Sequence, residues 1–431
     1  MVKTMKLLSR KILSSFVLLA IVVAVLYASF GLSQKTADAA WYTTGGTWSY
    51  RKPIIVDHSK VAGTTNISNF PILVSVTDSE LKSVANGGKV ASDSGFDILF
   101  TSLDGTTKLS HEIEKYDPTT GELVAWVNIP TLSVSVDTSL FIYFGNASAS
   151  DQQDVADGVN DVWDSNFEGV WHLASTTGTT LIDSSSNAQD LTKVSASVPN
   201  PIVGKVDGAQ DFSLGDSDSP SCSDANCGGT SDLDIGTRAF TISVWVKPDT
   251  SQGNGLAAFQ GGFLLSKIGD TESGWFIALD DLKIACGVRI SLGTEYACST
   301  TGSQLTIGSW AYVTVVIDRP NSTMYRYLNG ETYGISGSVG FPASNVNHNL
   351  NFCIGARDGG AGCRDRLYDG VLDEARVSNV VRSAGWIKTE YNNQSSPSTF
   401  YSYGALGVQT RTVPAEKVRG GVKVKGGVKF K

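Results

Sequence analysis

The chain lacks the short motifs that mark many common enzymes. It has no G-x-S-x-G turn, no H-E-x-x-H helix and no Gly-rich P-loop, so serine-hydrolase, zinc-protease and nucleotide-binding chemistry are not indicated. Histidine is scarce, with four residues in 431, and no two cysteines have the C-x-x-C spacing. A zinc site of the finger or ribbon type is therefore not indicated either.

Charged residues are also few, at 18%, whereas glycine is abundant at 45 residues and Thr, Ser and Val recur throughout. Because β-branched residues suit a pleated surface and glycine supplies turns, this composition predicts a turn-rich β protein. No helix of crossover length separates the apolar segments of the first 150 residues, which argues against a parallel α/β sheet. The length suits two or three domains.

Charge is distributed unevenly along the chain. The total net charge is −8, but residues 1–40 carry +4 and residues 413–431 carry +5, which leaves −17 on the body between them. Such an acidic body repels phosphate backbones, so nucleic acid is not an expected partner.

The N-terminus has the features of an export signal. Four basic residues precede an apolar run at 12–32, and residues 37–40 (A-D-A-A) supply the small side chains of a cleavage site. The run could also span a bilayer, which takes about 20 residues, so an uncleaved anchor is the alternative to cleavage near Ala39 or Ala40. Either fate places the body outside the cytosol, with membrane contact confined to residues 12–32.

All six cysteines lie in the second half of the chain, and an even number in an exported protein predicts disulfides. Six cysteines allow fifteen connectivities. The sequential connectivity needs the least rearrangement and gives the pairs Cys222–Cys227, Cys286–Cys298 and Cys353–Cys363.

Two of these pairs fit hairpin geometry. If Cys286 faces Cys298, then Val288 faces Tyr296 and Ile290 faces Thr294, around a three-residue loop that ends in glycine. If Cys353 faces Cys363, the pairing continues to Ala356 and Gly360. One face of the strand around Cys286 is apolar and consists of Leu282, Ile284, Cys286, Val288 and Ile290. The Cys286–Cys298 bridge is therefore expected on the core side.

Residues 41–150 contain short segments of alternating apolar and polar residues, separated by Gly, Asn or Asp turns. Their order is distinctive: W-S-Y-R-K-P at 48–53, N-F-P-I-L-V at 69–74, G-F-D-I-L-F-T at 95–101, H-E-I-E at 111–114, A-W-V at 125–127 and I-Y-F-G-N at 142–146. The series resembles DUF2341, a β module of unassigned activity found in exported prokaryotic proteins. Residues 151–165 are polar and rich in Asp, and we interpret them as a linker.

A second β module is expected over residues 166–404. Its pieces are D-S-S-S-N at 183–187, F-T-I-S-V-W-V-K-P at 240–248, W-A-Y-V-T-V-V at 310–316, Y-L-N-G at 327–330 and D-G-V-L-D-E-A-R-V at 369–377. In this order they resemble the laminin-G-like, concanavalin A-like superfamily, which implies a jelly roll that recognises sugars or proteins. The predicted fold is all-β, with two β-sandwich domains that follow an N-terminal apolar helix.

The resemblance also implies a calcium site. In the relatives that bind Ca²⁺, ligands come from the early D-S-S-G-N turn and from the late Asp-Glu strand, which here correspond to Asp183, Asn187 (through its carbonyl) and Asp373. Ser186 stands where glycine is usual, so the turn departs from the pattern. The alternative is that Asp183 caps a turn and Asp373 pairs with Arg376.

Other polar and aromatic residues allow weaker predictions. Glu112 and Glu114 point to one face of a strand, and we expect that face to be solvated beside Lys115. His172, between two apolar residues, is expected to be a core histidine. Of the tryptophans and tyrosines that could stack on a sugar, Trp275 and Tyr333 are the candidates for exposure and ligand binding.

Together these features predict an exported protein, secreted or anchored at the cell surface, that binds a glycan or another protein and is not an enzyme. Because the concanavalin A-like fold also hosts glycosidases, a polysaccharide-active hydrolase or its accessory module is one alternative. The other is a structural surface or adhesin subunit, in which the basic Gly/Val/Lys tail at 405–431 contacts an anionic polymer or a neighbouring subunit. That tail repeats V-R-G-G-V-K as V-K-G-G-V-K and is also compatible with disorder.

Overall fold

Antiparallel strands dominate the structure, as the composition predicts. The computed structural model describes residues 39–409 except 154–160, 175–177, 196–197, 216–218, 228–232, 253–260, 270, 292–293, 299–301, 337–339, 342–344 and 361. The predicted signal or anchor and most of the basic tail lie outside the described residues. None of the helices in the described part of the chain combines the length and apolar character that a membrane span requires.

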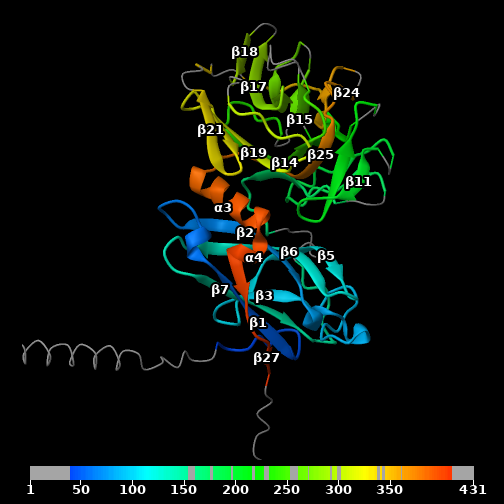
Figure 1. Cartoon of the computed structure of the whole chain (residues 1–431), viewed down its shortest axis with the longest axis vertical. Helices are drawn as coiled ribbons and strands as arrows, with labels where there is room; N and C mark the ends of the chain where they lie inside the picture. The colour runs from blue at the N-terminus through cyan, green and yellow to red at the C-terminus, as the bar shows by residue number, and fades with distance from the viewer. Residues whose placement is uncertain are drawn as a thin grey trace, which may run out of the picture.

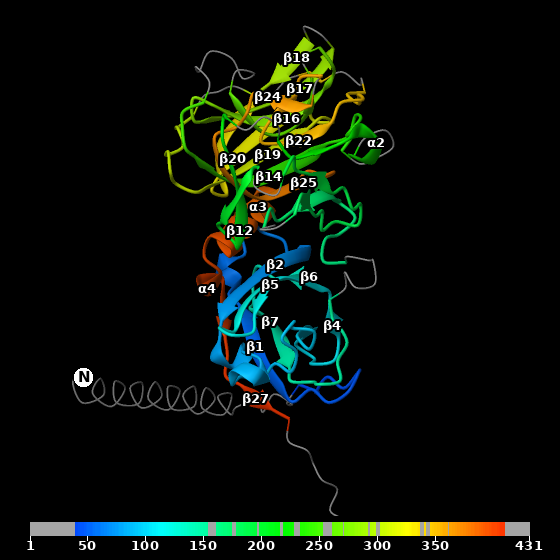
Figure 2. The same ribbon diagram turned by 90° about the vertical axis from the view of Figure 1, so that its right-hand side faces the viewer.

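Two β modules are stacked along the long axis of the molecule (Figures 1 and 2). We call strands β1–β7, together with β26 and β27, the first module and strands β8–β25 the second module. The all-β prediction is confirmed; the described helices are short.

The first module consists of a six-stranded sheet and a three-stranded sheet. The six-stranded sheet contains β1 (Tyr50–Val56), β3 (Leu99–Ser102), β4 (Lys108–Leu109), β7 (Thr138–Phe144), β26 (Tyr401–Tyr403) and β27 (Gly407–Val408). The other contains β2 (Ile67–Thr77), β6 (Glu122–Leu132) and β5 (His111–Asp117) in that order. The 3-10 turns are η1 (His58–Lys60), η2 (Ser79–Leu81) and η3 (Val84–Asn86).

The second module packs two eight-stranded sheets face to face. One sheet runs β18 (Thr294–Ala297), β17 (Lys283–Ser291), β16 (Gly274–Asp280), β15 (Gly262–Ile268), β22 (Phe352–Ile354), β13 (Ser221–Cys222), β10 (Leu191–Thr192) and β9 (Thr180–Leu181). The other runs β11 (Asn200–Val203), β12 (Gly208–Phe212), β25 (Gly370–Ser378), β14 (Phe240–Pro248), β19 (Ala311–Asp318), β20 (Thr323–Leu328) and β21 (Glu331–Ser336), with β8 (Phe167–Trp171) also paired to β25. A hairpin of β23 (Arg357–Asp358) and β24 (Cys363–Asp365) and the helical turn α2 (Asp224–Cys227) complete the module.

The end of the chain returns to the first module. After β25, helices α3 (Ala384–Ser395) and α4 (Pro397–Phe400) lead to β26 and β27, which both pair with β1 (Figure 1). The Asn393 side chain accepts from the Leu73 amide at 2.6 Å and donates to its carbonyl at 3.0 Å, which fixes α3 to β2. The boundary that we expected at 404 assigns α3, α4 and β26 to the jelly roll and β27 to the basic tail, whereas β26 and β27 both pair with β1 of the first module. The domain boundaries stay predictions.

The two modules share buried surface. Every residue of β25 is buried, because one face of the strand contacts the core of the second module and the other contacts the first module. The core of the first module extends to Val316 and Tyr327 on β19 and β20 and to Trp386 on α3. The polar and aromatic side chains at this contact are therefore held in a protein interior rather than on a solvated surface.

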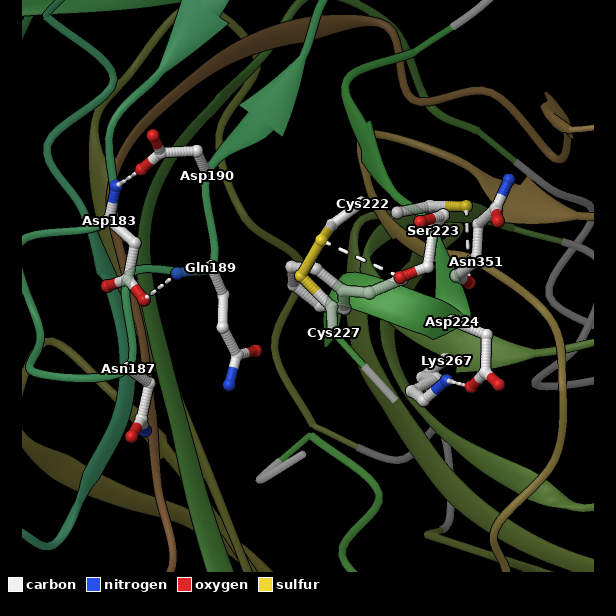
Figure 3. Close-up of a disulfide and its surroundings, with 12 residues drawn as sticks. Asp183, Asn187, Gln189, Asp190, Cys222, Ser223, Asp224, Cys227, Lys267 and Asn351 are labelled. Carbon is white, nitrogen blue, oxygen red and sulfur yellow. Dashed lines mark hydrogen bonds and ion pairs between the residues drawn. A yellow bond between two sulfur atoms is a disulfide. The ribbon is translucent and has the colours of Figure 1, made fainter. Parts of the chain in front are cut away.

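All three predicted disulfides are confirmed (Figure 3 shows Cys222–Cys227). Val288 faces Tyr296 as expected, but a bulge after Arg289 sets Ser291, not Ile290, opposite Thr294. The hairpin predicted for the third bridge is wrong. Asp358 of β23 faces Cys363 of β24. Cys353 lies on β22, which pairs with β13 and β15, so the bridge connects β22 to β24, two strands that do not pair with each other.

Candidate functional site at the module junction

The junction is built around the polar sequence D-E-A-R at 373–376 in β25. Opposite Val244 of β14, this strand contains one extra residue, and Glu374 adopts a left-handed φ of 52°. A bulge of this kind changes the direction of the side chains that follow it. Asp373 and Glu374 are both fully buried, and Arg376 is 1% exposed.

Arg376 joins the two modules. Its guanidinium lies 4.4 Å from the ring centre of Trp126 and 4.7 Å from that of Trp163. It also donates to Glu374 and to Glu390 of α3, each at 2.5 Å. A desolvated guanidinium between indole faces and two carboxylates gains both cation–π and ionic stabilisation. The two carboxylates outweigh the cost of burial and raise the pKa of Arg376. The expected pairing of Asp373 with Arg376 is wrong.

His172 lies beside Arg376 and is surrounded by three glutamates. Its Nδ1 is 2.8 Å from Glu374 Oε1 and 3.5 Å from Glu114 Oε2, and its Nε2 is 3.6 Å from Glu112 Oε2. The imidazole is stacked on Trp126, with ring centres 5.6 Å apart. His172 is buried as predicted, but it belongs to a charged cluster.

The glutamates of β5 are held by neutral donors as well. The indole N–H of Trp163 donates to Glu112 Oε2 at 2.9 Å, and the Ser184 hydroxyl donates to Glu112 Oε1 at 2.6 Å. The indole N–H of Trp126 donates to Glu114 Oε2 at 2.9 Å. Our expectation that Glu112 and Glu114 form a solvated face is therefore wrong, since their side chains are 12% and 3% exposed.

The environment separates the pKa values of these groups. Burial opposes the ionisation of Glu112, but the charge of His172 and the surrounding hydrogen bonds prevail and lower its pKa to about 2. Burial, with the negative charge of Glu374, raises the pKa of Glu114 to about 8. Burial disfavours the imidazolium, yet the three carboxylates raise the pKa of His172 well above its ordinary value. These shifts favour the ionised form of Glu112, the protonated form of Glu114 and the imidazolium form of His172.

A cavity of about 310 Å³ opens beside this cluster. One wall carries Glu112, Glu114 and His172, and the other is formed by the Thr180–Leu181 strand and its flanking residues Ile182 and Ser184. The cavity therefore combines hydrogen-bonding groups with apolar surface, and it receives side chains from both modules.

Each module contains a segment that matches a known protein-family model. Residues 94–173 match the family model of DUF2341, a domain of unknown function. Residues 224–388 match that of the concanavalin A-like lectin/glucanases superfamily, Laminin_G_3. The chain thus carries a match to the DUF2341 model followed by a match to the concanavalin A-like model, and we name the two modules after these matches. Both resemblances seen in the sequence are thereby confirmed.

The solved structures that match the chain have low sequence identities and low TM-scores. The binding domain of Paraclostridial Mosquitocidal Protein 1 is 14% identical, with a TM-score of 0.41 over 52% of each chain. Domain 4 of the GH43 arabinanase AbnA from Geobacillus stearothermophilus, in complex with arabinotriose, is 15% identical, with a TM-score of 0.37 over 52% of this chain and 97% of that one. The Ruminococcus gnavus IT-sialidase CBM40, bound to alpha2,3 sialyllactose, is 14% identical, with a TM-score of 0.32 over 42% and 94%. The chain thus spans about half the length of the first of these, and no curated protein matches it.

The junction site draws on both matched families. Glu112, Glu114 and His172 lie within the DUF2341 match, together with both indoles that contact Arg376. Glu374 and Arg376 lie within the concanavalin A-like match. The strand that suggested the second domain by its D-E-A-R sequence is therefore also the strand that contacts the DUF2341 domain.

The turn predicted to bind calcium has protein donors around its carboxylate. Asp183 accepts from the amides of Val170, Ser185 and Gln189 at 2.8–2.9 Å and from the Ser185 hydroxyl at 2.8 Å (Figure 3 shows the Gln189 bond). This agrees with the alternative that Asp183 organises a turn. Burial, only partly offset by these bonds, raises its pKa. The Asn187 side chain donates to the backbone carbonyls of Phe167 and Glu168.

Asp373 holds a different loop. Its Oδ2 accepts from the amides of Lys205 and Val206 at 2.6 and 3.0 Å, and burial raises its pKa well above the ordinary value. Among the described residues, the two His/Cys/Asp/Glu groups compact enough to hold an ion include neither Asp183 nor Asp373. Calcium at Asp183, Asn187 and Asp373 stays a prediction.

The aromatic candidates lie elsewhere in the concanavalin A-like domain. Trp275 is 1% exposed, packs against Phe240 and Phe352 and donates to the Leu233 carbonyl, so our expectation that it is exposed is wrong. Tyr333 is half-buried, and its hydroxyl donates to the Ser303 carbonyl. A ligand role for Tyr333 stays a prediction.

One signal could have revealed the buried glutamates. Glu112 lies directly opposite Trp126 on β6, and Trp126 stands in the apolar A-W-V segment at 125–127. A buried indole N–H needs an acceptor, and an acidic residue on the neighbouring strand can supply it. The contact with residues 374–376, more than 250 positions away, has no local signal.

Proposed function

We propose that the chain is a non-catalytic recognition protein that works outside the cytosol and binds carbohydrate in the junction cavity. The observation that carries this proposal is the mixed lining of the cavity. Sugars present hydroxyl groups and apolar C–H faces together, so a site lined by the carboxylates of Glu112 and Glu114, the hydroxyls of Thr180 and Ser184, and the apolar side chains of Ile113 and Ile182 suits them. The volume of about 310 Å³ fits a ligand of one or two sugar units.

The location outside the cytosol is supported by the disulfides. Three bridges lie within the concanavalin A-like domain, and such bridges persist in oxidising compartments. They agree with the export signal expected from the sequence, so a secreted or surface-anchored protein is the proposal.

A glycan array tests the proposal. Ile182 lines the cavity and is 67% exposed, so Ile182→Asp changes the lining without removing a core side chain. Val136, 64% exposed and outside this lining, provides the matched control Val136→Asp. We expect wild type and V136D to bind the same glycans and I182D to lose them. Silence of the wild type across all glycans contradicts the proposal, as does unchanged binding by I182D.

The array also tests calcium if it is repeated with a calcium-selective chelator. Loss of binding with EGTA, restored by added Ca²⁺, supports the predicted site at Asp183, Asn187 and Asp373. Binding that persists in EGTA removes calcium from the account and leaves the cavity proposal in place.

Glycoside hydrolysis is the second candidate, because one observation favours it. Glu112 has a pKa lowered to about 2 and Glu114 a pKa raised to about 8, which is how a base and an acid are set apart in many hydrolases. However, a catalytic pair flanks the bond that it cleaves, whereas these carboxylates flank His172 at 3.6 and 3.5 Å. Release of reducing sugar by wild type and not by Glu114→Gln supports hydrolysis; no release by either supports binding alone.

A further inference from the structure

The junction cluster contains more carboxylates than cationic side chains. Glu112, Glu114 and Glu374 surround one imidazole, while Arg376 is shared between Glu374 and Glu390. Burying this many carboxylates is costly unless protons or a cation neutralise them. The charge alone does not identify the neutralising species.

One buried polar atom of the cluster points to a ligand. Glu114 Oε1 makes no hydrogen bond within the described structure, although it is shielded from solvent. The Glu114 side chain is 3% exposed, that of His172 is 9% exposed, and both residues line the cavity. A buried carboxylate oxygen without a donor needs another partner.

The ligand atoms are close enough together to share one ion. One atom each from Glu114, His172 and Glu374 falls in a group whose members all lie within 4.8 Å of one another. From His172 Nδ1, Glu374 Oε1 is at 2.8 Å and Glu114 Oε2 is at 3.5 Å. A tetrahedral ion with bonds of about 2.1 Å separates its ligand atoms by about 3.4 Å, so small side-chain shifts suffice.

We propose that Glu114, His172 through Nδ1, and Glu374 bind a divalent transition-metal ion of the Zn²⁺ class. The proposal is independent of the sugar proposed for the cavity. One imidazole with two carboxylates suits zinc or manganese, whereas Ca²⁺ takes six to eight oxygen ligands and no nitrogen.

The surrounding groups would orient the three ligands. Glu112 faces the second ring nitrogen of His172 at 3.6 Å, as carboxylates do beside metal-bound histidines. Arg376 holds the other oxygen of Glu374, and the Trp126 indole N–H holds Glu114. Because Glu114 and His172 line the cavity, the ion would keep a coordination position open toward it.

Titration with metal tests the proposal on the full mature chain, stripped with chelator and free of any histidine tag. We expect about one equivalent of Zn²⁺ by calorimetry, and with Co²⁺ the visible absorption of a four-coordinate site. Glu114→Gln removes a ligand and should weaken Zn²⁺ binding by more than the about 10–100-fold lost when a residue that only holds a ligand is replaced. Glu122→Gln, at a 39% exposed position on the neighbouring strand β6, should leave binding unchanged.

Two results would overturn the proposal. The first is a wild-type chain that takes up neither Zn²⁺, Mn²⁺ nor Co²⁺, which means that protons alone neutralise the cluster. The second is Zn²⁺ uptake that is the same in wild type and Glu114→Gln, which places the ion elsewhere. If the variant does not fold, the Co²⁺ spectrum of the wild type still decides whether the chain holds a four-coordinate site, and its absence contradicts the proposal.

Discussion

The Arg376 guanidinium, on the concanavalin A-like domain, lies 4.4 Å from the ring centre of Trp126, on the DUF2341 domain. This contact joins the two domains, and Arg376 also holds Glu374 beside it and Glu390 on the returning helix α3. Substitutions at the junction should therefore affect the whole molecule.

Replacing Arg376 tests this coupling. Arg376→Met leaves two buried carboxylates without their shared partner, so we expect a loss of about 3–5 kcal/mol in the free energy of unfolding, measured by urea denaturation. Lys283, which pairs with Asp281 and whose side chain is 25% exposed beside a 36% exposed partner, gives the control Lys283→Met, with an expected loss below about 1 kcal/mol. Equal losses in the two variants would show that the Arg376 contacts contribute no more to the free energy of unfolding than a surface ion pair does.

The return of the chain to the first module predicts opposite effects for two truncations. A chain of residues 39–409 keeps β26 and β27 on β1, so its melting temperature should match that of a chain of residues 39–431. A chain that ends at Ser378 loses both strands and the Asn393 bonds to Leu73, so the DUF2341 domain should not fold. Calorimetric melting with two intact transitions in the shorter chain would contradict the shared architecture.

The disulfide that closes the longer loop should contribute more to the free energy of unfolding. Cys286–Cys298 spans 12 residues and Cys222–Cys227 spans 5. Loop entropy predicts losses of about 3 kcal/mol for the double variant C286A/C298A and about 2 kcal/mol for C222A/C227A. Urea denaturation of both variants checks the order, and a larger loss for the shorter loop would contradict it.

Acid should destabilise the protein through Glu112. Its pKa is lowered from 4.5 to about 2 in the fold, so its contribution is present above pH 4.5 and is lost as the pH falls through 2. The groups that face it are the positive His172, the Ser184 hydroxyl and the Trp163 indole. Stability measured in chelator should fall less steeply with acid in Glu112→Gln than in wild type; parallel curves would show that Glu112 is not responsible.

Local patterns in the sequence were sufficient for much of the fold. Alternation and turn residues indicated strands, the order of motifs indicated both families, and cysteine spacing indicated the three disulfides. The register of the Cys353–Cys363 hairpin was wrong because Cys353 pairs with β13 and β15, which lie far away in sequence. Similarly, alternation alone cannot tell a face that meets solvent from one that meets another domain, so Glu112 and Glu114 were misplaced.

The return of β26 to β1 shows the same limit. The two strands are about 350 residues apart, and Tyr401–Tyr403 is too short to indicate a partner. The bulge at Glu374 depends on its pairing with β14 and likewise has no signal in the D-E-A-R sequence itself. Calcium at Asp183 was implied by family resemblance, whereas the metal proposed at His172 follows from three-dimensional proximity.

Hydrogen–deuterium exchange with and without a glycan found on the array tests the central claim, that recognition occurs at the junction. We expect protection of the backbone at 112–114, 180–182 and 184, which line the cavity from the two domains. Protection confined to the other side of the concanavalin A-like domain, around the cavity lined by Thr250, Gln252 and Leu367, would contradict the account.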